Sequence, residues 1–364
     1  MQVESNKNKL IIFAWAATFA LVAIIGFAYV KWIPYYAKAF VAYSQHSIGD
    51  SIIFGKASAA PEASVSAALD YAIAYGKSIW KAMLLGLLLG SGIKVLLPSH
   101  WVSAVLGRLG FKSVMLGGLF ALPCMMCTCC AAPVAAGMRQ SRASVGSVVS
   151  WWLANPLLNP ATIVFMGFVL GWGWALFRLV FGIAMVLGIA YLAERYTESK
   201  KPNLNKEDIS AEDLSQKDVL RQHLPLESEV SSDGVMLRWA REFMSLTIKL
   251  LPEYLVLVLL LGAARAWLFP VFGADDSIIW IFALALAGML FVIPTAGEVP
   301  IVQAMFALGM GAGPAAALIM TLPAVSLPSL VMLGKVFSVQ MRLLIAISVV
   351  LFGIIAGFVA KFLF

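Results

Sequence analysis

Four cysteines dominate the chemistry that this sequence offers. They are all the cysteines of the chain and fall within seven residues, at Cys124, Cys127, Cys129 and Cys130. A thiolate is a soft ligand and nucleophile, so the cluster predicts a binding or metal site for a thiophilic species such as Cu(I), Zn(II) or trivalent arsenic. A helix expected over 131–139 would direct its positive end at Cys129 and Cys130 and favour their thiolate forms. Binding would then release protons, which offers a route to proton-coupled transport.

A carboxylate is the second chemical group. Glu298 lies between Pro294 and Pro300 in an otherwise apolar part of the chain, where a charge costs about 2.5–3.5 kcal/mol on membrane-insertion scales. That cost favours a functional role, in which Glu298 neutralises a cation or carries the coupling proton. The structural alternative is an ion pair with Arg265 or Lys94 that ties helices together.

Neutral oxygen donors complete the predicted substrate-binding set. They are Asn155, Asn159, Thr295 and Ser326, with Ser329 close by. Residues of these types also cap helices, so capping is the alternative role. The three histidines have no ligand spacing, and the sequence has no Walker motif, phosphate-binding glycine loop or triad pattern. The sequence therefore predicts neither an enzyme nor a resident cofactor, and any soft metal would be the transported substrate.

Composition indicates that these groups belong to a membrane protein. The 364 residues are 61% hydrophobic and 12% charged, with a mean hydropathy of +0.90, whereas about a quarter of the residues of a soluble domain are charged. Several continuous apolar stretches reach the roughly 20 residues that cross a bilayer as a helix. The net charge of +7 does not indicate nucleic-acid binding, because 11 of the 19 acidic residues lie between positions 194 and 242. The remaining basic excess is typical of cytoplasmic loops beside a lipid bilayer.

The apolar segments divide the chain into four parts. Residues 1–69 would hold a first transmembrane helix over 10–30, with a cytoplasmic N-terminus, followed by a polar extracytoplasmic segment. The apolar run is too long for a signal peptide and no clear cleavage site follows it. Residues 70–193 and 243–364 would form two membrane repeats, joined by a polar cytoplasmic linker over 194–242.

An internal repeat relates the two membrane parts. At an offset of 172, Leu87-Leu88-Leu89-Gly90 matches Leu259-Leu260-Leu261-Gly262. At an offset of 167, Pro133, Met138, Gly146, Pro156, Val164 and Gly167 match Pro300, Met305, Gly313, Pro323, Val331 and Gly334. A shared spacing of prolines and glycines is much harder to obtain by chance than shared leucines, so the repeat is structural.

Basic residues indicate that the repeats are inverted. Arg108 and Lys112 lie in a loop whose second-half counterpart, 271–277, has no basic residue, while Lys335 and Arg342 flank a loop whose first-half counterpart is uncharged. Because basic loops stay in the cytoplasm, corresponding loops of the two halves would lie on opposite sides of the membrane.

Each repeat would contain a re-entrant helical hairpin and a broken transmembrane helix. The hairpins would break at 124–130 and 294–300, and the next segments at 155–160 and 323–328. Irregular backbone survives within a membrane where it lines a cavity or is buried in protein, so the four breaks predict one central site. The expected fold is an all-α polytopic membrane protein with two inverted-topology repeats, preceded by an extra N-terminal transmembrane helix.

The cysteine segment and the first broken helix carry a family resemblance. The run Cys127-Thr128-Cys129-Cys130-Ala131-Ala132-Pro133-Val134-Ala135, then Gly146 and Asn155-Pro156-Leu157-Leu158-Asn159-Pro160, resembles the signature of the ArsP-type permeases over about residues 75–363. The resemblance implies a permease of a bacterial inner membrane that exports trivalent organoarsenicals, copper or zinc. The cysteine pair of that family corresponds to Cys127 and Cys129, while Cys124 and Cys130 go beyond its pattern and favour a bare soft metal ion.

The leading functional prediction is proton-coupled export of a thiophilic metal or metalloid. One alternative is a membrane thiol–disulfide electron carrier with Cys124 and Cys127 as its redox pair. A second alternative is a permease for a small sulfur compound. The sequence leaves the substrate, the direction of transport and the oligomeric state open.

Overall fold

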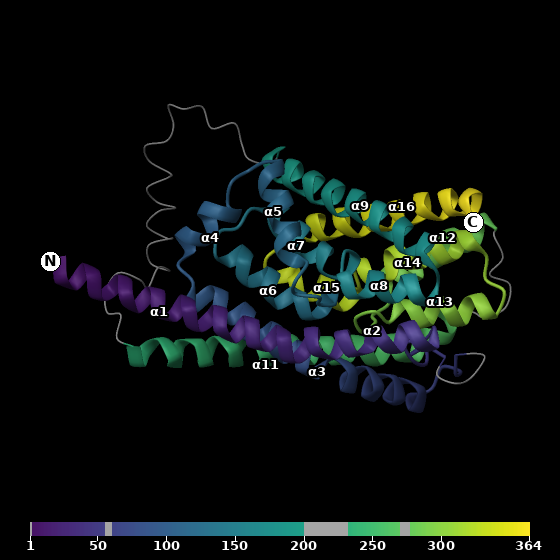
Figure 1. Ribbon diagram of the computed structural model, residues 1–364, viewed down its shortest axis with the longest axis horizontal. Coiled ribbons are helices and arrows are strands. Elements are labelled where there is room, and N and C mark those ends of the chain that lie inside the picture. The colour runs from purple at the N-terminus through teal and green to yellow at the C-terminus, as the bar shows by residue number, and fades with distance from the viewer. Residues whose placement is uncertain (1, 55–59, 200–231, 270–276) are drawn as a thin grey trace.

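Every regular element that the computed structural model describes is a helix (Figure 1). It describes residues 2–54, 60–199, 232–269 and 277–364. The first half comprises α1 (Gln2–Phe27), η1 (Ala28–Trp32), α2 (Ile33–Gln45), α3 (Val65–Leu96), α4 (Ser99–Leu106), α5 (Phe111–Ala121), α6 (Thr128–Gln140), α7 (Val145–Leu157), α8 (Pro160–Val169) and α9 (Trp172–Ser199). The second comprises α11 (Ser232–Leu268), α12 (Ile278–Leu290), α13 (Glu298–Ala307), α14 (Ala312–Ala324), α15 (Leu327–Met332), η2 (Leu333–Lys335) and α16 (Val339–Leu363).

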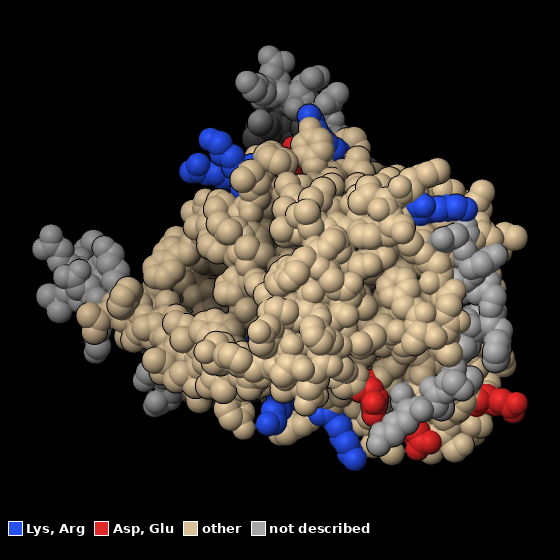
Figure 2. Space-filling model, turned by 45° about the vertical axis from the view of Figure 1, so that its right-hand side comes forward, with Lys and Arg blue, Asp and Glu red and all other residues tan. Residues whose placement is uncertain are grey.

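The lengths of these helices confirm a multi-pass membrane protein. In the described part of the chain, seven helical stretches are long and apolar enough to cross a bilayer. Most of the face drawn in Figure 2 is uncharged, and its Lys, Arg, Asp and Glu side chains lie towards the edges. Such a surface suits contact with lipid tails, because burying a charge there is costly.

The first transmembrane stretch is longer than the sequence predicts. Instead of ending near residue 30, α1 continues through the π-helical turn η1 into α2, so that one apolar stretch runs over Leu10–Gln45. Pro34 explains the turn, because it has no N–H to donate to the carbonyl four residues earlier. The turn carries Lys31, whose side chain is buried.

From α3 onwards, and apart from α4 in the first half and the 3-10 turn η2 in the second, the helices follow the same order in both halves. A long helix (α3 or α11) precedes two short helices, a helix that ends early, a shorter continuation and a final long helix. The interruptions fall in the segments where the sequence predicts breaks, between α5 and α6, α7 and α8, α12 and α13, and α14 and α15. Of the predicted linker, α9 and α11 include the two ends, and 200–231 lies outside the described residues.

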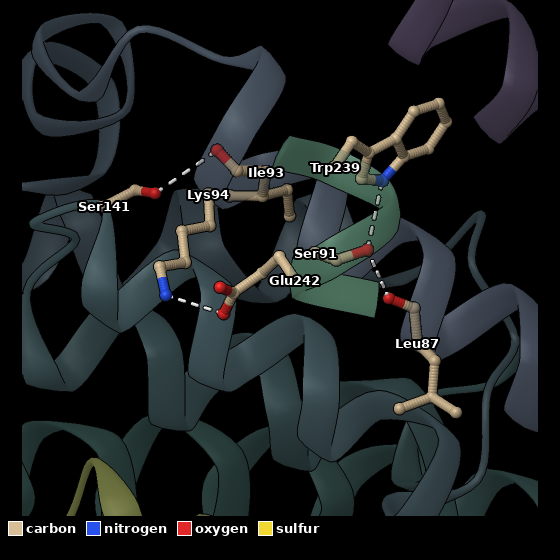
Figure 3. A network of polar contacts seen from close by, with 7 residues as sticks. All are labelled: Leu87, Ser91, Ile93, Lys94, Ser141, Trp239 and Glu242. Carbon is tan, nitrogen blue, oxygen red and sulfur yellow. Dashed lines mark hydrogen bonds and ion pairs between the residues drawn. The ribbon is translucent and has the colours of Figure 1, made fainter. Parts of the chain in front are cut away.

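The leading helices of the two halves, α3 and α11, pack side by side (Figures 1 and 3). Lys94 of α3 forms an ion pair of 2.6 Å with Glu242 of α11. One turn away, the indole of Trp239 donates to the Ser91 hydroxyl over 3.0 Å, and this hydroxyl donates to the Leu87 carbonyl (Figure 3). This polar contact fixes the register of the two halves at one end of the bundle.

Glycines of α3 set the position of α6, the helix that follows the cysteines. A methyl group at Gly86 would collide with the Cys130 carbonyl oxygen, and one at Gly90 with the Pro133 carbonyl. Small residues four positions apart let two membrane helices approach backbone to backbone. The glycine in the repeated Leu-Leu-Leu-Gly segment therefore holds the cysteine helix against α3.

Candidate substrate site

The thiols of Cys127 and Cys130 face each other at the start of α6. Cys127 is the N-cap residue, and its Sγ lies 3.0 Å from that of Cys130, with both residues present as free thiols. The helix begins at Thr128, so the predicted start at residue 131 is wrong. The positive helix end therefore lies at Cys127 rather than at Cys129 and Cys130. Two thiols this close can bind one soft atom together.

The other two cysteines point to different neighbours. The Sγ of Cys129 lies 3.4 Å from the Ser326 hydroxyl. Cys124 donates to the Phe120 carbonyl over 3.4 Å and borders a separate apolar cavity beside α1 and α4. Among the residues that the structure describes, no three Cys, His, Asp or Glu side chains are placed to hold one metal ion. The structure thus brings Cys127 and Cys130 together but does not gather all four predicted metal ligands.

The interruptions of both halves meet beside these thiols. The Thr128 hydroxyl lies 3.5 Å from the hydroxyl of Ser326, which precedes α15 in the second half. A narrow gap separates the four interruptions, and its lining includes Cys127, Thr128, Pro156, Thr295, Glu298 and Pro323. Residues from the four breaks therefore lie around one point within the protein.

Glu298 forms a buried ion pair with Arg178. The carboxylate lies at the first position of α13, 2.6 Å from the Arg178 guanidinium, and both side chains are almost fully buried. Neither predicted partner takes part, since Lys94 pairs with Glu242 and Arg265 stacks on the ring of Tyr71. The structural alternative therefore predicted an ion pair of Glu298 correctly but named the wrong partners.

Arg178 also reaches the break of the first half. Its Nη2 donates to the Pro156 carbonyl over 2.7 Å, and its Nε donates to the Leu157 carbonyl over 3.1 Å. These carbonyls end α7, where proline and the helix terminus leave acceptors unpaired. One guanidinium therefore ties the broken helix of the first half to the acidic break of the second.

The predicted oxygen donors mainly hold backbone in place. Asn155 accepts from the Met126 amide and donates to the Trp151 carbonyl. Asn159 caps α8 by accepting from two backbone amides, and the hydroxyls of Ser326 and Ser329 form a capping box for α15. The contacts of Asn159, Ser326 and Ser329 agree with the capping alternative, whereas Asn155 joins α7 to the segment before α6. Thr295 differs, because its hydroxyl faces a lysine.

A polar cavity of about 500 Å³ opens beside Cys127. Its lining combines α2 and the preceding turn, the segment before α3, α3 itself and the second-half break, and includes Lys31, Tyr35, Lys38, Asp50, Ser78, Cys127, Thr295 and Pro300. Lys31 donates to the Thr295 hydroxyl over 2.9 Å and to the Tyr35 hydroxyl over 3.2 Å. Lys31 is not among the residues predicted for the site. A lysine that directly follows an apolar run and lies three residues before Pro34 could have identified it as a candidate site residue.

Two buried tyrosines, like Arg178, are further residues that the sequence did not identify. Tyr75 of α3 and Tyr254 of α11 have ring centroids 6.1 Å apart and lie near Cys129. Tyr71 and Tyr75 are spaced by four in an apolar helix, which is the pattern that could have identified this face.

Comparisons with known proteins agree with this architecture. Residues 9–166 and 64–362 match the ArsP_1 family, described as a predicted permease. The UPF0718 protein YraQ of Escherichia coli (strain K12) is 49% identical over 345 residues, which cover 94% of this chain and 93% of that protein. The UPF0718 protein MJ0584 of Methanocaldococcus jannaschii is 24% identical over 334 residues, which cover 77% of this chain and 90% of that protein. No solved structure matches the chain. The protein belongs to the ArsP_1 family of predicted permeases.

Proposed function

We propose that the protein is a secondary-active permease that exports a small thiophilic species through the site at Cys127. The observation that carries this proposal is the position of Cys127, which borders both the polar cavity and the gap where the four breaks meet. A thiol at that point can bind a soft atom on its way between the cavity and the second half. Transport, rather than catalysis, is also the role that the family description implies.

Two inverted repeats would give this permease its alternating access. The equal order of helices in the two halves supports the repeat, and the pairing of each basic loop with a loop that has no basic residue supports its inversion. In this arrangement α5 with α6 and α12 with α13 are re-entrant hairpins, whose tips lie near the middle of a bacterial inner membrane. The N-terminus and the linker would then be cytoplasmic.

The cysteine geometry favours a trivalent metalloid over a bare metal ion as the substrate. Cys127 and Cys130 offer two adjacent thiols, whereas Cys124 lies in another cavity. A trivalent arsenic compound with two hydroxyl groups needs two thiols: two As–S bonds form, two As–O bonds break, and the thiol protons leave with the hydroxyls as water. Four-thiol coordination, which suits Zn(II) better, has less support.

Proton coupling is the driving force that we propose, since the sequence has no nucleotide-binding motif. Glu298 is held by Arg178, and this supports a structural role for the carboxylate better than that of a mobile proton carrier. The thiols are the better candidates, because a bound cation would displace their protons. This release accompanies a cation only, since exchange with an arsenic hydroxide gives water and no free proton.

A thiol–disulfide carrier is the second candidate function, and the 3.0 Å between Cys127 and Cys130 is the observation that favours it. The redox pair would then be Cys127 with Cys130 instead of Cys124 with Cys127. Trapping of thiols in growing cells separates the two functions. A Cys127–Cys130 disulfide that forms and disappears with growth conditions would support the carrier.

A growth-inhibition panel tests the permease. Cells with and without the gene would be compared in methylarsenite, arsenite, Cu, Zn, Hg and Cd, and then with Cys127→Ser or Cys124→Ser variants at equal membrane abundance. We expect resistance to trivalent arsenicals that Cys127→Ser abolishes and Cys124→Ser preserves. Full resistance in the Cys127→Ser strain would refute the role of this thiol.

A further inference from the structure

The ammonium group of Lys31 is a buried positive charge without a carboxylate beside it. The residue is only 4% exposed, and its Nζ donates to two hydroxyls, those of Tyr35 and Thr295. Within the described ranges, no Asp or Glu oxygen lies within 4.0 Å of this nitrogen. Hydroxyls satisfy the hydrogen bonds of an ammonium group but not its charge, so an unpaired one is costly to bury. A bound anion would therefore stabilise the Lys31 ammonium group at this position.

The charges around the cavity do not supply that anion. Lys38 and Asp50 also line it, but both residues are exposed and of opposite sign, so they offset each other at its mouth. Lys31 lies deeper, near the thiols of Cys127 and Cys130, which supply a counter-charge only when one of them is a thiolate. With these thiols protonated, or bound to a soft cation, the buried part of the cavity is positive on the side that faces them.

Lys31 lies on the inward-facing side of this helical stretch. Phe27, four residues earlier, is buried as well, whereas Tyr29 and Ile33 are exposed. Residues four apart share one face of a helix, and residues two apart lie on opposite faces. The π-helical turn that carries Lys31 is a feature that is frequent at functional sites.

The size of the cavity indicates an organic molecule. Its volume of about 500 Å³ falls in the range of about 300–1,000 Å³ that small-molecule pockets occupy. A bare metal cation needs a far smaller space and would be repelled by Lys31. The volume of the cavity and the positive charge of Lys31 therefore both argue against free Cu(I) or Zn(II) as the cargo.

We propose that this cavity binds a small organic anion, with its negative group at Lys31, Tyr35 and Thr295 and its soft atom directed at Cys127. The cargo is then an anionic conjugate of the thiophilic atom, such as one with a carboxylate-bearing thiol. This identification of the cargo rests on the proposed function, in which Cys127 receives the substrate. The anion site itself does not depend on the proposed function, and it can be tested without a transport assay.

Thiol labelling with charged reagents tests the site. In a purified full-length variant with Cys124→Ser, Cys129→Ser and Cys130→Ser, the remaining thiol is Cys127. It would be treated in neutral detergent with the anionic sulfonatoethyl or the cationic trimethylammonioethyl methanethiosulfonate. In either case the Cys127 sulfur forms a disulfide with the reagent's sulfenyl sulfur, the S–SO2 bond breaks, and methanesulfinate leaves while the thiol proton passes to water. The mass of the intact protein measures the rate of labelling. Each rate is then divided by the rate at which free cysteine reacts with the same reagent.

The anionic reagent should react faster by about tenfold in these normalised rates, since attraction and repulsion by a nearby buried charge act in opposite directions on the two reagents. Lys31→Met should remove the preference, and Lys31→Arg should keep it. Lys38→Met, at the exposed mouth, is the matched control and should change the ratio much less. Equal rates, a cationic preference, or no labelling of Cys127 by either reagent would overturn the proposal.

The labelling result and the growth panel can fail separately. An anionic preference in a protein that confers no resistance would leave the anion site in place and refute the export of thiophilic species. Resistance without the preference would refute the anion site alone. A Lys31→Met variant that elutes as an aggregate would be replaced by Thr295→Val, which removes one of the two hydroxyls that hold the ammonium and should reduce the preference.

Discussion

The Arg178 guanidinium and the Glu298 carboxylate meet at 2.6 Å inside the protein, from opposite halves of the chain. Arg178 also holds the carbonyls of Pro156 and Leu157, so this ion pair connects the interruption after α7 with the interruption before α13. The carboxylate lies at the first position of α13, where the helix dipole favours a negative charge. The pair therefore fixes the relative position of two breaks that border the site.

Removal of one charge of this pair should destabilise the protein. Glu298→Gln leaves Arg178 buried without its counter-charge, which costs about 3–5 kcal/mol in comparable buried pairs. We expect a lower melting temperature of the purified protein in detergent and less protein in the membrane. The double variant Arg178→Met with Glu298→Gln should recover part of the loss. A double variant whose loss equals the sum of the two single losses would contradict direct coupling.

The fold was largely predictable, because its determinants are local. Continuous apolar runs define the spans, and the repeated prolines at 133, 156, 300 and 323 lie inside the helices that begin or end at the four interruptions. The length of the first helix was not predictable in the same way. Hydropathy falls after residue 30, yet α2 stays helical because Tyr35 and Ala39 pack against the core, which is a tertiary effect.

The site was predictable in its residue types but not in its pairings. The cluster at 124–130 identified the thiols, yet only the geometry of the α6 N-terminus decides that Cys127 faces Cys130 while Cys124 lies elsewhere. The partner of Glu298 is set by how α9 packs beside α14, which no spacing in the sequence reports. Lys31 belongs to a part of the chain outside the repeats, so it has no counterpart in the second half that could mark it.

The close approach of α3 and α6 can be tested at two glycines of one helix. Gly86→Ala would place a methyl group against the backbone of Cys130, which cannot give way as a side chain can, at a cost of about 1–3 kcal/mol. We expect a lower melting temperature and slower cross-linking of Cys127 to Cys130 by dibromobimane, which fluoresces strongly once both thiols have reacted. Gly76→Ala is the matched control, since its methyl group would meet nothing within 4 Å. Equal behaviour of the two variants would refute the contact.

The pairing of thiols predicts which cysteines act together. Cys127→Ser and Cys130→Ser should each abolish tight binding of a trivalent organoarsenical, because one thiol alone cannot form both As–S bonds. Cys124→Ser should bind normally, and Cys129→Ser should bind with at most a modest loss, since its thiol faces Ser326. Titration of the purified variants, followed by protection from a thiol reagent, measures this. Loss of binding in Cys129→Ser with normal binding in Cys130→Ser would show that the wrong pair has been assigned.

The protons released on binding should reveal the kind of cargo that the site accepts. A divalent cation such as Cd(II) displaces the protons of the thiols that it binds, so acid should appear in a weakly buffered solution. An arsenic compound with two hydroxyls should release water and leave the pH unchanged, since each thiol proton departs with a hydroxyl. A pH indicator added during the titration of purified protein distinguishes the cation from the arsenical. The double variant Cys127→Ser with Cys130→Ser gives the background proton release. Proton release by the arsenical in excess of this background would contradict the exchange of its two hydroxyls for the thiols of Cys127 and Cys130.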